Sequence, residues 1–170
     1  MTDIVHPAYV YSAKFFPGDL VGERFILVTL CFDGKIRVYY IEVHKGIINP
    51  PELIKETFIE IDKSRGDQQL IDLRYPSSLT FGRNGIMFIG DSRGDVHIWE
   101  MKSRFKNIEL YPVKKISDKE ISGDPINNIL IPNQQTNKIL IHTRDNCIRE
   151  INYEKKKNSK VTKIIFLIFR

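Results

Sequence analysis

The sequence predicts an all-β fold: a fragment of a β-propeller with about three four-stranded blades. The first observation is a recurrence, since a tight-turn pair followed by an alternating strand occurs at 33–40, at 93–100 and, more diverged, at 145–152. The second is that apolar residues alternate along most of the chain, without a convincing capped helical stripe. A recurring strand-rich unit is typical of propellers, in which each blade is a four-stranded sheet.

The first blade is expected over residues 6–62. Asp33-Gly34 predicts a hairpin turn between its second and third strands, because glycine accepts positive φ at little steric cost. A proline pair is typical of loops, so 46–51 is expected to be a loop inserted between the third and fourth strands. The four strands are expected near 8–15, 25–31, 35–42 and 54–61.

The second blade is expected over 77–117, after a further loop insertion at 63–76. The segment Gly82-Arg83-Asn84-Gly85 joins two of its strands and is expected to be a β-turn. It lacks the complete glycine pattern, the Lys-Ser/Thr pair and the following helix of a phosphate-binding loop. The strands of this blade are expected near 78–82, 86–90, 95–101 and 109–116.

The third blade is expected over 122–169 and includes a basic segment at 154–160 and a possible final strand at 161–169. The basic segment could be a nuclear-localisation signal or a patch for acidic surfaces, but a solvated loop is favoured, because the segment is short and flanked by strands. Propellers close with about 4–8 blades, so the chain is expected to be a fragment or truncated product completed by remaining blades or another chain. The strands of this blade are expected near 126–131, 138–143, 147–153 and 161–168.

The net charge of +5 would by itself suggest a nucleic-acid partner. The excess lies in residues 154–170, which hold six basic residues and one acidic residue, whereas the rest of the chain holds 20 of each. A phosphate-binding face needs basic residues clustered on the folded body. No nucleic-acid partner is therefore expected.

The sequence also bears on compartment and metal content. No signal peptide is evident, and the longest apolar run, at 164–169, is six residues long, whereas a membrane span needs about 20. Cys31 and Cys147 lie far apart in the chain, and His142 with Cys147 has no further ligands at zinc spacing. A cytoplasmic protein with no membrane span, no metal and no cofactor is therefore expected.

Trp99-Glu100 stands where WD-repeat proteins have their Trp-Asp dipeptide, and the chain resembles that family in the placing of its polar residues. His6, Thr29 and Asp33 occupy the places of a hydrogen-bonded chain that in WD repeats ends at a tryptophan of the third strand, here replaced by Tyr39. The resemblance implies a buried network that stabilises each blade, provided that its polar groups are satisfied. The residues assigned to this structural network are His6, Thr29, Asp33, Tyr39, Trp99 and Asp145.

A hydrolase that uses His6 and Asp33 stays open as an alternative, because His, Thr and Asp together also resemble a catalytic constellation. No oxyanion-stabilising device or nucleophile elbow is evident, so a structural role is favoured and no catalytic residue is predicted. Tyr39, Tyr40 and Trp99 could likewise form an aromatic cage. Their alternation within strands instead favours core packing between blades for Tyr39 and Trp99.

Three stretches together resemble one group of WD-repeat proteins: 6–15 with 26–29, 79–81 with 90–99, and 123–126 with 139–145. The string Ile141-His142-Thr143-Arg144-Asp145 in the last stretch is not required of a generic WD repeat. The group is the jouberin-like family of the ciliary base. The resemblance covers about residues 6–153 and implies a non-enzymatic scaffold at the transition zone or basal body, supporting cilium assembly and vesicle delivery.

The resemblance implies protein partners from ciliary or trafficking complexes. The alternative is a WD-repeat adaptor in ubiquitin ligation or vesicle coating, without a ciliary role. Loops between the second and third strands are expected on one face of the disc, where aromatic residues and arginine suit a protein interface. The residues assigned to this possible interaction face are Phe32, Lys35, Arg93 and Arg144.

Overall fold

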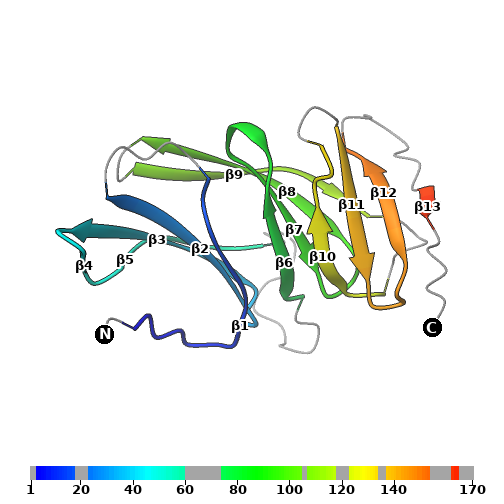
Figure 1. Ribbon diagram of the computed structural model, residues 1–170. Coiled ribbons are helices and arrows are strands. Elements are labelled where there is room, and N and C mark those ends of the chain that lie inside the picture. The colour runs from blue at the N-terminus through cyan, green and yellow to red at the C-terminus, as the bar shows by residue number, and fades with distance from the viewer. Residues whose placement is uncertain are drawn as a thin grey trace.

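The computed structural model contains three antiparallel β-sheets placed side by side (Figure 1). This confirms the predicted all-β fold, and the arrangement is consistent with part of a β-propeller. No helix within the described part of the chain is long and apolar enough to cross a membrane. The structure describes residues 3–17, 23–59, 74–104, 107–117, 123–133, 137–153 and 162–164.

The first sheet places its main strands in the order β1, β2, β3, β5, and all four overlap predicted strands. The segment predicted as a loop at 46–51 contains a further short strand, β4, which pairs with the end of β3. Lys45 and Gly46 both have positive φ, at 51° and 76°, which suits the two-residue turn of a hairpin. The strands are β1 (Val10–Phe15), β2 (Arg24–Cys31), β3 (Lys35–His44), β4 (Ile47–Ile48) and β5 (Glu52–Phe58).

The middle sheet contains four strands in chain order, again overlapping the predicted ones. The segment 82–85 turns the chain between two of them, as predicted, and includes the short 3₁₀ turn η2 (Arg83–Gly85). Asn84 and Gly85 have positive φ there, and a Cβ at residue 85 would collide with the backbone carbonyl of Met101. The strands are β6 (Pro76–Phe81), β7 (Ile86–Asp91), β8 (Val96–Arg104) and β9 (Asn107–Ile116).

The third sheet also follows chain order. Its first three strands lie where they are predicted, and 162–164, within the predicted final strand, forms β13. Most of the loop insertion predicted at 63–76, namely 63–73, and the basic segment at 154–160 lie outside the described residues. The last residue of that insertion, Pro76, begins β6. The strands are β10 (Ile126–Leu130), β11 (Lys138–Thr143), β12 (Ile148–Asn152) and β13 (Thr162–Ile164).

Two apolar layers join the sheets face to face. Between the first and middle sheets, Ile26, Val28, Ile36 and Val38 pack in one buried cluster with Leu79, Met87 and Trp99. Between the middle and third sheets, Phe88, Val96 and Ile98 pack in a second cluster with Ile126, Ile139 and Ile151. Side chains alternate along a strand, so each inner strand of the middle sheet contributes to both layers.

The two aromatic residues predicted to lie in the core are both buried, but in different surroundings. Trp99 is 2% exposed and belongs to the layer between the first and middle sheets. Tyr39 is 6% exposed and follows Val38, so it points to the opposite face of the first sheet. There the ring of His6 packs edge-on against it, with ring centres 5.4 Å apart. Tyr39 is therefore covered by the N-terminal segment.

Candidate functional site

The turns between the second and third strands of the three sheets share one geometry. The backbone N–H of residue 34, 94 or 146 donates to the carbonyl three residues earlier. Gly34, Gly94 and Asn146 have positive φ, at 78°, 85° and 60°. These turns lie along the same side of the molecule, the lower edge in Figure 1. This edge, termed the turn edge, carries most of the predicted site residues.

In the first sheet, the turn is held by a buried arginine. Arg37 is 2% exposed, and its guanidinium donates to both carboxylate oxygens of Asp33, at 3.2 and 2.5 Å. Its Nε donates to Glu56 on β5, at 2.6 Å. Burial raises the pKa of Asp33, but the hydrogen bonds from Arg37 and from the Lys35 backbone outweigh it, so the pKa lies below its usual value. Two carboxylates therefore neutralise one buried cation.

The third sheet repeats this arrangement with the same spacing. Arg149 is 3% exposed and donates to both oxygens of Asp145, at 3.1 and 2.5 Å. Arg149 also donates to Oγ1 of Thr143, which in turn donates to Asp145 at 2.5 Å. The hydrogen bond from Arg149 holds the pKa of Asp145 far below its usual range. Asp145 therefore belongs to a hydrogen-bonded network whose central partner is Arg149.

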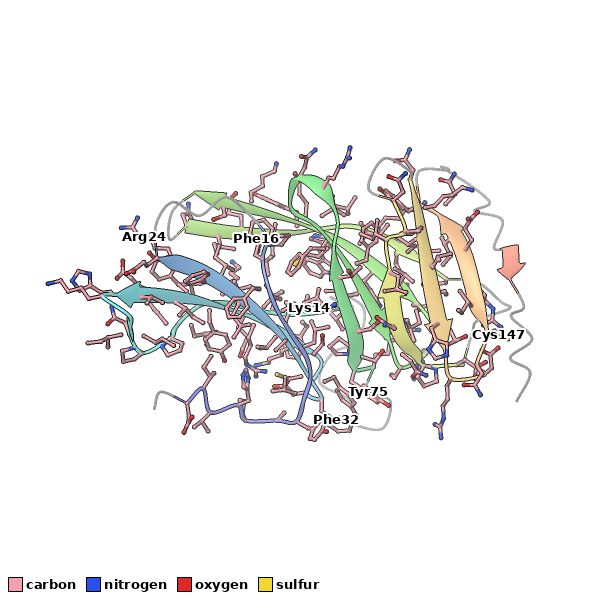
Figure 2. The ribbon with its side chains drawn as sticks, in the orientation of Figure 1. Lys14, Phe16, Arg24, Phe32, Tyr75 and Cys147 are labelled. Carbon is pink, nitrogen blue, oxygen red and sulfur yellow. The ribbon has the colours of Figure 1, made fainter. Side chains whose placement is uncertain are left out.

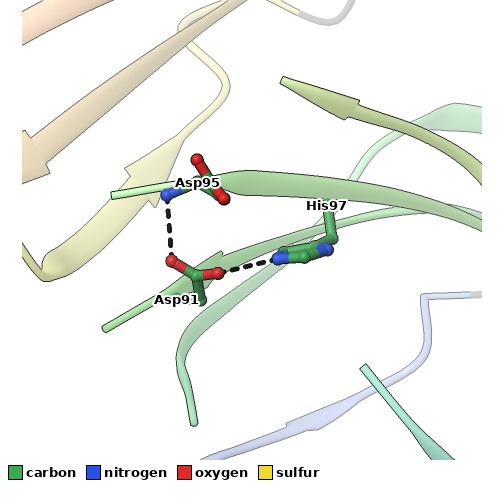
Figure 3. Close-up of side chains that lie close together, drawn as sticks. All are labelled: Asp91, Asp95 and His97. Atoms are coloured by element: carbon green, nitrogen blue, oxygen red, sulfur yellow. Dashed lines mark hydrogen bonds and ion pairs between the residues drawn. The ribbon is translucent and has the colours of Figure 1, made fainter. Parts of the chain in front are cut away.

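The middle sheet builds its network from different positions (Figure 3). Aligned on the glycine of the turn, Arg93 stands where Asp33 stands in the first sheet. The carboxylate is supplied instead by Asp91, the last residue of β7, whose Oδ1 accepts the backbone N–H groups of Arg93 and Asp95 at 2.9 Å each. Its Oδ2 lies 2.8 Å from Nε2 of His97.

Asp91 is fully buried. Burial raises its pKa, but hydrogen bonds from His97 and from the backbone of Asp95 and Arg93 outweigh it and place the pKa below its usual value. Asp91 is therefore ionised in the folded protein at neutral pH.

Asp91, Asp95 and His97 also form a set of three buried groups whose ligand atoms lie within 4.8 Å of one another. Such a set has the donor chemistry of a metal site. Positive charge is already present, because Arg74 contacts both carboxylates and Lys115 Nζ lies 3.6 Å from Asp95. A metal ion would have to compete with the Arg74 guanidinium, so the set is best described as an ion-pair cluster.

The hydrogen-bonded chain predicted through His6, Thr29 and Asp33 is corrected by the structure. Both carboxylate oxygens of Asp33 accept hydrogen bonds from the guanidinium of Arg37. Thr29 is buried, and its Oγ1 makes no hydrogen bond within the described part of the chain. His6 Nδ1 lies 3.5 Å from Sγ of Cys31. His6 thus contacts the ring of Tyr39 and the sulfur of Cys31. Among the described residues, no hydrogen bond joins His6 to Thr29 or Asp33.

Neither Cys31 nor the lining of the pocket beside His97 provides an activated nucleophile. Cys31 is fully buried, and burial raises the pKa of its thiol, whereas a reactive cysteine needs its thiolate form. A pocket of about 270 Å³ beside His97 and Trp99 is lined otherwise by Ile59, Ile98, Pro112, Val113, Lys114 and Lys115, without a hydroxyl or thiol. The carboxylates of Asp33, Asp91 and Asp145 are engaged by arginine, histidine or backbone N–H groups.

An aromatic cluster lies at the turn edge where the first and middle sheets meet. Tyr11 stacks on Tyr75 with ring centres 4.7 Å apart and planes 10° apart. Phe32 lies 5.1 Å from Tyr75 and 6.2 Å from Tyr11, and Tyr9 lies 5.3 Å from Tyr11. Tyr9 is 73% exposed, Phe32 40% and Tyr11 39%. Figure 2 shows Phe32 and Tyr75 together at this edge. These four residues are termed the aromatic cluster.

Among the other residues of the predicted interaction face, Lys35 and Arg93 are less available, whereas Arg144 is exposed but lies in another sheet. Lys35 donates to Glu56 at 2.5 Å and lies over the ring of Phe58. Arg93 is half-buried, and its backbone is tied to Asp91 and Gly123. Arg144 is exposed, in the turn of the third sheet. Of the four predicted residues, Phe32 alone belongs to the aromatic cluster.

Comparison with models of known protein families gives no match, and no curated protein matches the chain at a significant level.

Proposed function

We propose that the protein is a non-enzymatic scaffold that binds other proteins through the aromatic cluster. The observation that carries this proposal is the exposure of Tyr9, Tyr11 and Phe32 in one contiguous group with Tyr75. Aromatic side chains are enriched at the energetic centres of protein interfaces, since they bury a large area and lose little rotamer freedom. Their hydroxyl groups add directional hydrogen bonds.

The rest of the turn edge supports a scaffold more than an enzyme. Asp33, Asp91 and Asp145 are each engaged in bonds that hold a turn to a third strand. Carboxylates bonded in this way stabilise the turns, and their oxygens are not positioned to exchange a proton with a substrate.

A second surface is open on the first sheet. Phe15, Phe25 and Leu53 are 59%, 42% and 49% exposed and share a face with Tyr39, by their cross-strand register. The corresponding face of the middle sheet is covered by the first sheet, through residues such as Met87 and Trp99. We propose that further blades or another chain cover this face and complete the ring.

The ciliary part of the proposal rests on the resemblance of 6–15, 79–81 and 139–145 to jouberin-like WD-repeat proteins. In that case the scaffold acts at the transition zone or basal body. The alternative is a WD-repeat adaptor in ubiquitin ligation or vesicle trafficking. Imaging of the tagged full-length protein separates the two, because absence from ciliated-cell basal bodies would favour the adaptor.

The binding proposal is tested by comparing interaction partners of three forms of the protein in quantitative affinity purification. We expect the double variant Phe32→Ala/Tyr9→Ala to lose a defined set of partners. The matched control is Tyr111→Ala, which removes a tyrosine of similar exposure, 42%, from β9 of the middle sheet. If the double variant retains every partner of the wild-type protein, the aromatic cluster is not the binding surface.

A further inference from the structure

We infer that the ligand of the aromatic cluster is an extended proline-rich segment of a partner protein. This inference rests on the proposed binding function and adds the chemical class of the ligand. Four features support it: the shape of the cluster, the state of its backbone groups, its hydroxyl donors and the charges around it.

The shape of the cluster is a strip of partly exposed rings, in which Tyr11 and Tyr75 stack on each other. It runs from Tyr9 through Tyr11 to Phe32 and Tyr75, with ring centres 4.7 to 6.2 Å apart. It spans two sheets, because Tyr11 lies on β1 and Tyr75 immediately precedes β6. A polyproline II helix has three residues per turn and rises about 3.1 Å per residue, so it presents proline rings at regular intervals to such a strip. Aromatic-lined surfaces are the common docking sites of proline-rich segments.

Backbone groups of three of the four cluster residues, Tyr9, Phe32 and Tyr75, are already paired. The N–H of Phe32 donates to the carbonyl of Tyr9 at 2.8 Å, and the carbonyl of Tyr75 accepts from Ser92 at 3.0 Å. The N–H of Tyr75 donates to Oγ of Ser92 at 3.3 Å. A ligand over Tyr9, Phe32 and Tyr75 therefore meets side chains and not these backbone groups, although β1, which carries Tyr11, lies at the edge of its sheet. Contact through side chains is the binding mode of a polyproline II helix, because prolines offer carbonyls and no N–H groups.

The cluster supplies donors that match those carbonyls. Three of its four residues are tyrosines, and a phenol hydroxyl donates to a backbone carbonyl. Burial, followed by the electrostatic effect of Tyr75 and a side-chain hydrogen bond with it, raises the pKa of Tyr11, so its hydroxyl keeps its proton at neutral pH. The hydroxyls of Tyr11 and Tyr75 are thus joined to each other, and Tyr9 carries a third hydroxyl for a ligand. The arrangement thus combines ring faces for proline with hydroxyls for the intervening carbonyls.

The charges around the cluster do not favour an acidic ligand. Arg74 precedes Tyr75, but its guanidinium is directed to Asp91 and Asp95. Arg37 is buried between Asp33 and Glu56. Single-stranded nucleic acid also stacks on aromatic side chains, but it needs a positively charged groove along its backbone. We therefore assign the cluster to a proline-rich peptide and treat nucleic acid as an outcome of the test.

The test is a titration of the purified 170-residue chain with fluorescein-labelled decaproline, followed by fluorescence polarisation. Labelled peptides of equal length made of Gly and Ser, and a labelled oligothymidine, serve as comparison ligands. Of the three labelled ligands, we expect only decaproline to show saturable binding. We expect Tyr9→Ala and Tyr75→Ala to weaken it about tenfold each, which corresponds to one buried aromatic contact of about 1.4 kcal/mol. Tyr11→Phe, which removes only a hydroxyl, should weaken binding less than either, and Tyr111→Ala should leave it unchanged.

Each other result counts against the inference. Binding of oligothymidine but not decaproline would assign the cluster to nucleic acid. Equal binding by Tyr111→Ala and Tyr9→Ala would place the peptide elsewhere; because Tyr9 is 73% exposed, loss of fold does not confuse this comparison. Failure of decaproline to bind, together with loss of natural partners in the Phe32→Ala/Tyr9→Ala variant, would overturn the ligand class and leave the scaffold function intact.

Discussion

The middle sheet and the third sheet stabilise the same turn with different residues. In the third sheet, the carboxylate lies within the turn, at Asp145, and pairs with Arg149 four residues later. In the middle sheet, the carboxylate lies two positions earlier, at Asp91, and pairs with His97 six residues later. Both arrangements connect the start of the third strand to the turn before it.

The comparison indicates that the turn requires a charge-assisted hydrogen bond, and that different sequence positions can supply the two groups. When Arg93 takes the position of the turn aspartate, the carboxylate reappears at the end of the preceding strand. The carboxylate in the middle sheet is also more deeply buried, because Asp91 is fully buried whereas the side chain of Asp145 is 28% exposed. Arg74 and Lys115 add positive charge only in the middle sheet. The two sheets should therefore differ in their sensitivity to mutation and to pH.

The largest effect is expected at Asp91. Asp91→Asn removes the charge that faces His97 and Arg74 and weakens the bonds to two backbone N–H groups. Breaking a buried charged network costs about 3–5 kcal/mol of unfolding free energy. Urea denaturation of the variant and the wild type measures this loss. A loss below 1 kcal/mol would show that the buried network contributes little to stability.

The pH dependence tests the same cluster. The pKa of Asp91 is lower in the folded protein than in the unfolded chain, where it is about 3.9. The stability from this group is therefore complete well above pH 3.9 and is lost as the pH falls through the lower, folded value. The gap in unfolding free energy between wild type and Asp91→Asn should be full at pH 6 and narrow below about pH 4. Asp3→Asn, at an exposed position, is the control and should show no such narrowing.

A smaller effect is expected at Asp145, and a still smaller one at Asp33. Asp145→Asn removes the carboxylate that accepts two hydrogen bonds from Arg149, which should cost about 2 kcal/mol. Asp33→Asn leaves Arg37 paired with Glu56, so the cost should be about 1 kcal/mol. The double variant Asp33→Asn/Glu56→Gln should then match or exceed Asp145→Asn. The reverse order of the two single variants would contradict the role given to Glu56.

The smallest effect is expected at Thr29. Its Oγ1 is buried without a hydrogen bond in the described part of the chain, so Thr29→Val replaces an unsatisfied hydroxyl by a methyl group of similar size. We expect unfolding free energy to stay the same or rise by up to about 1 kcal/mol. A clear loss of stability would instead restore Thr29 to the polar network that the sequence predicts.

Much of the fold could be predicted from local patterns. Twelve strands were expected, and each overlaps an observed strand, because alternation and turn residues act over a few neighbouring positions. The site was predicted less well. The repeated spacing Asp-x-x-x-Arg at 33–37 and 145–149 is visible in the sequence and could have identified Arg37 and Arg149. No repeated spacing marks Asp91 with His97, since that network departs from the other two.

Local sequence patterns specify short strands in three groups and the turns that separate them. Which side chains meet across sheets depends on how the sheets pack. Tyr11 and Tyr75 lie far apart in the chain and stack because the first and middle sheets pack side by side. Likewise, both carboxylate oxygens of Asp33 accept hydrogen bonds from Arg37 and none from Thr29, because a buried guanidinium is costly unless a carboxylate neutralises it. Strand patterns are local, whereas desolvation of charges and contact between sheets depend on the folded whole.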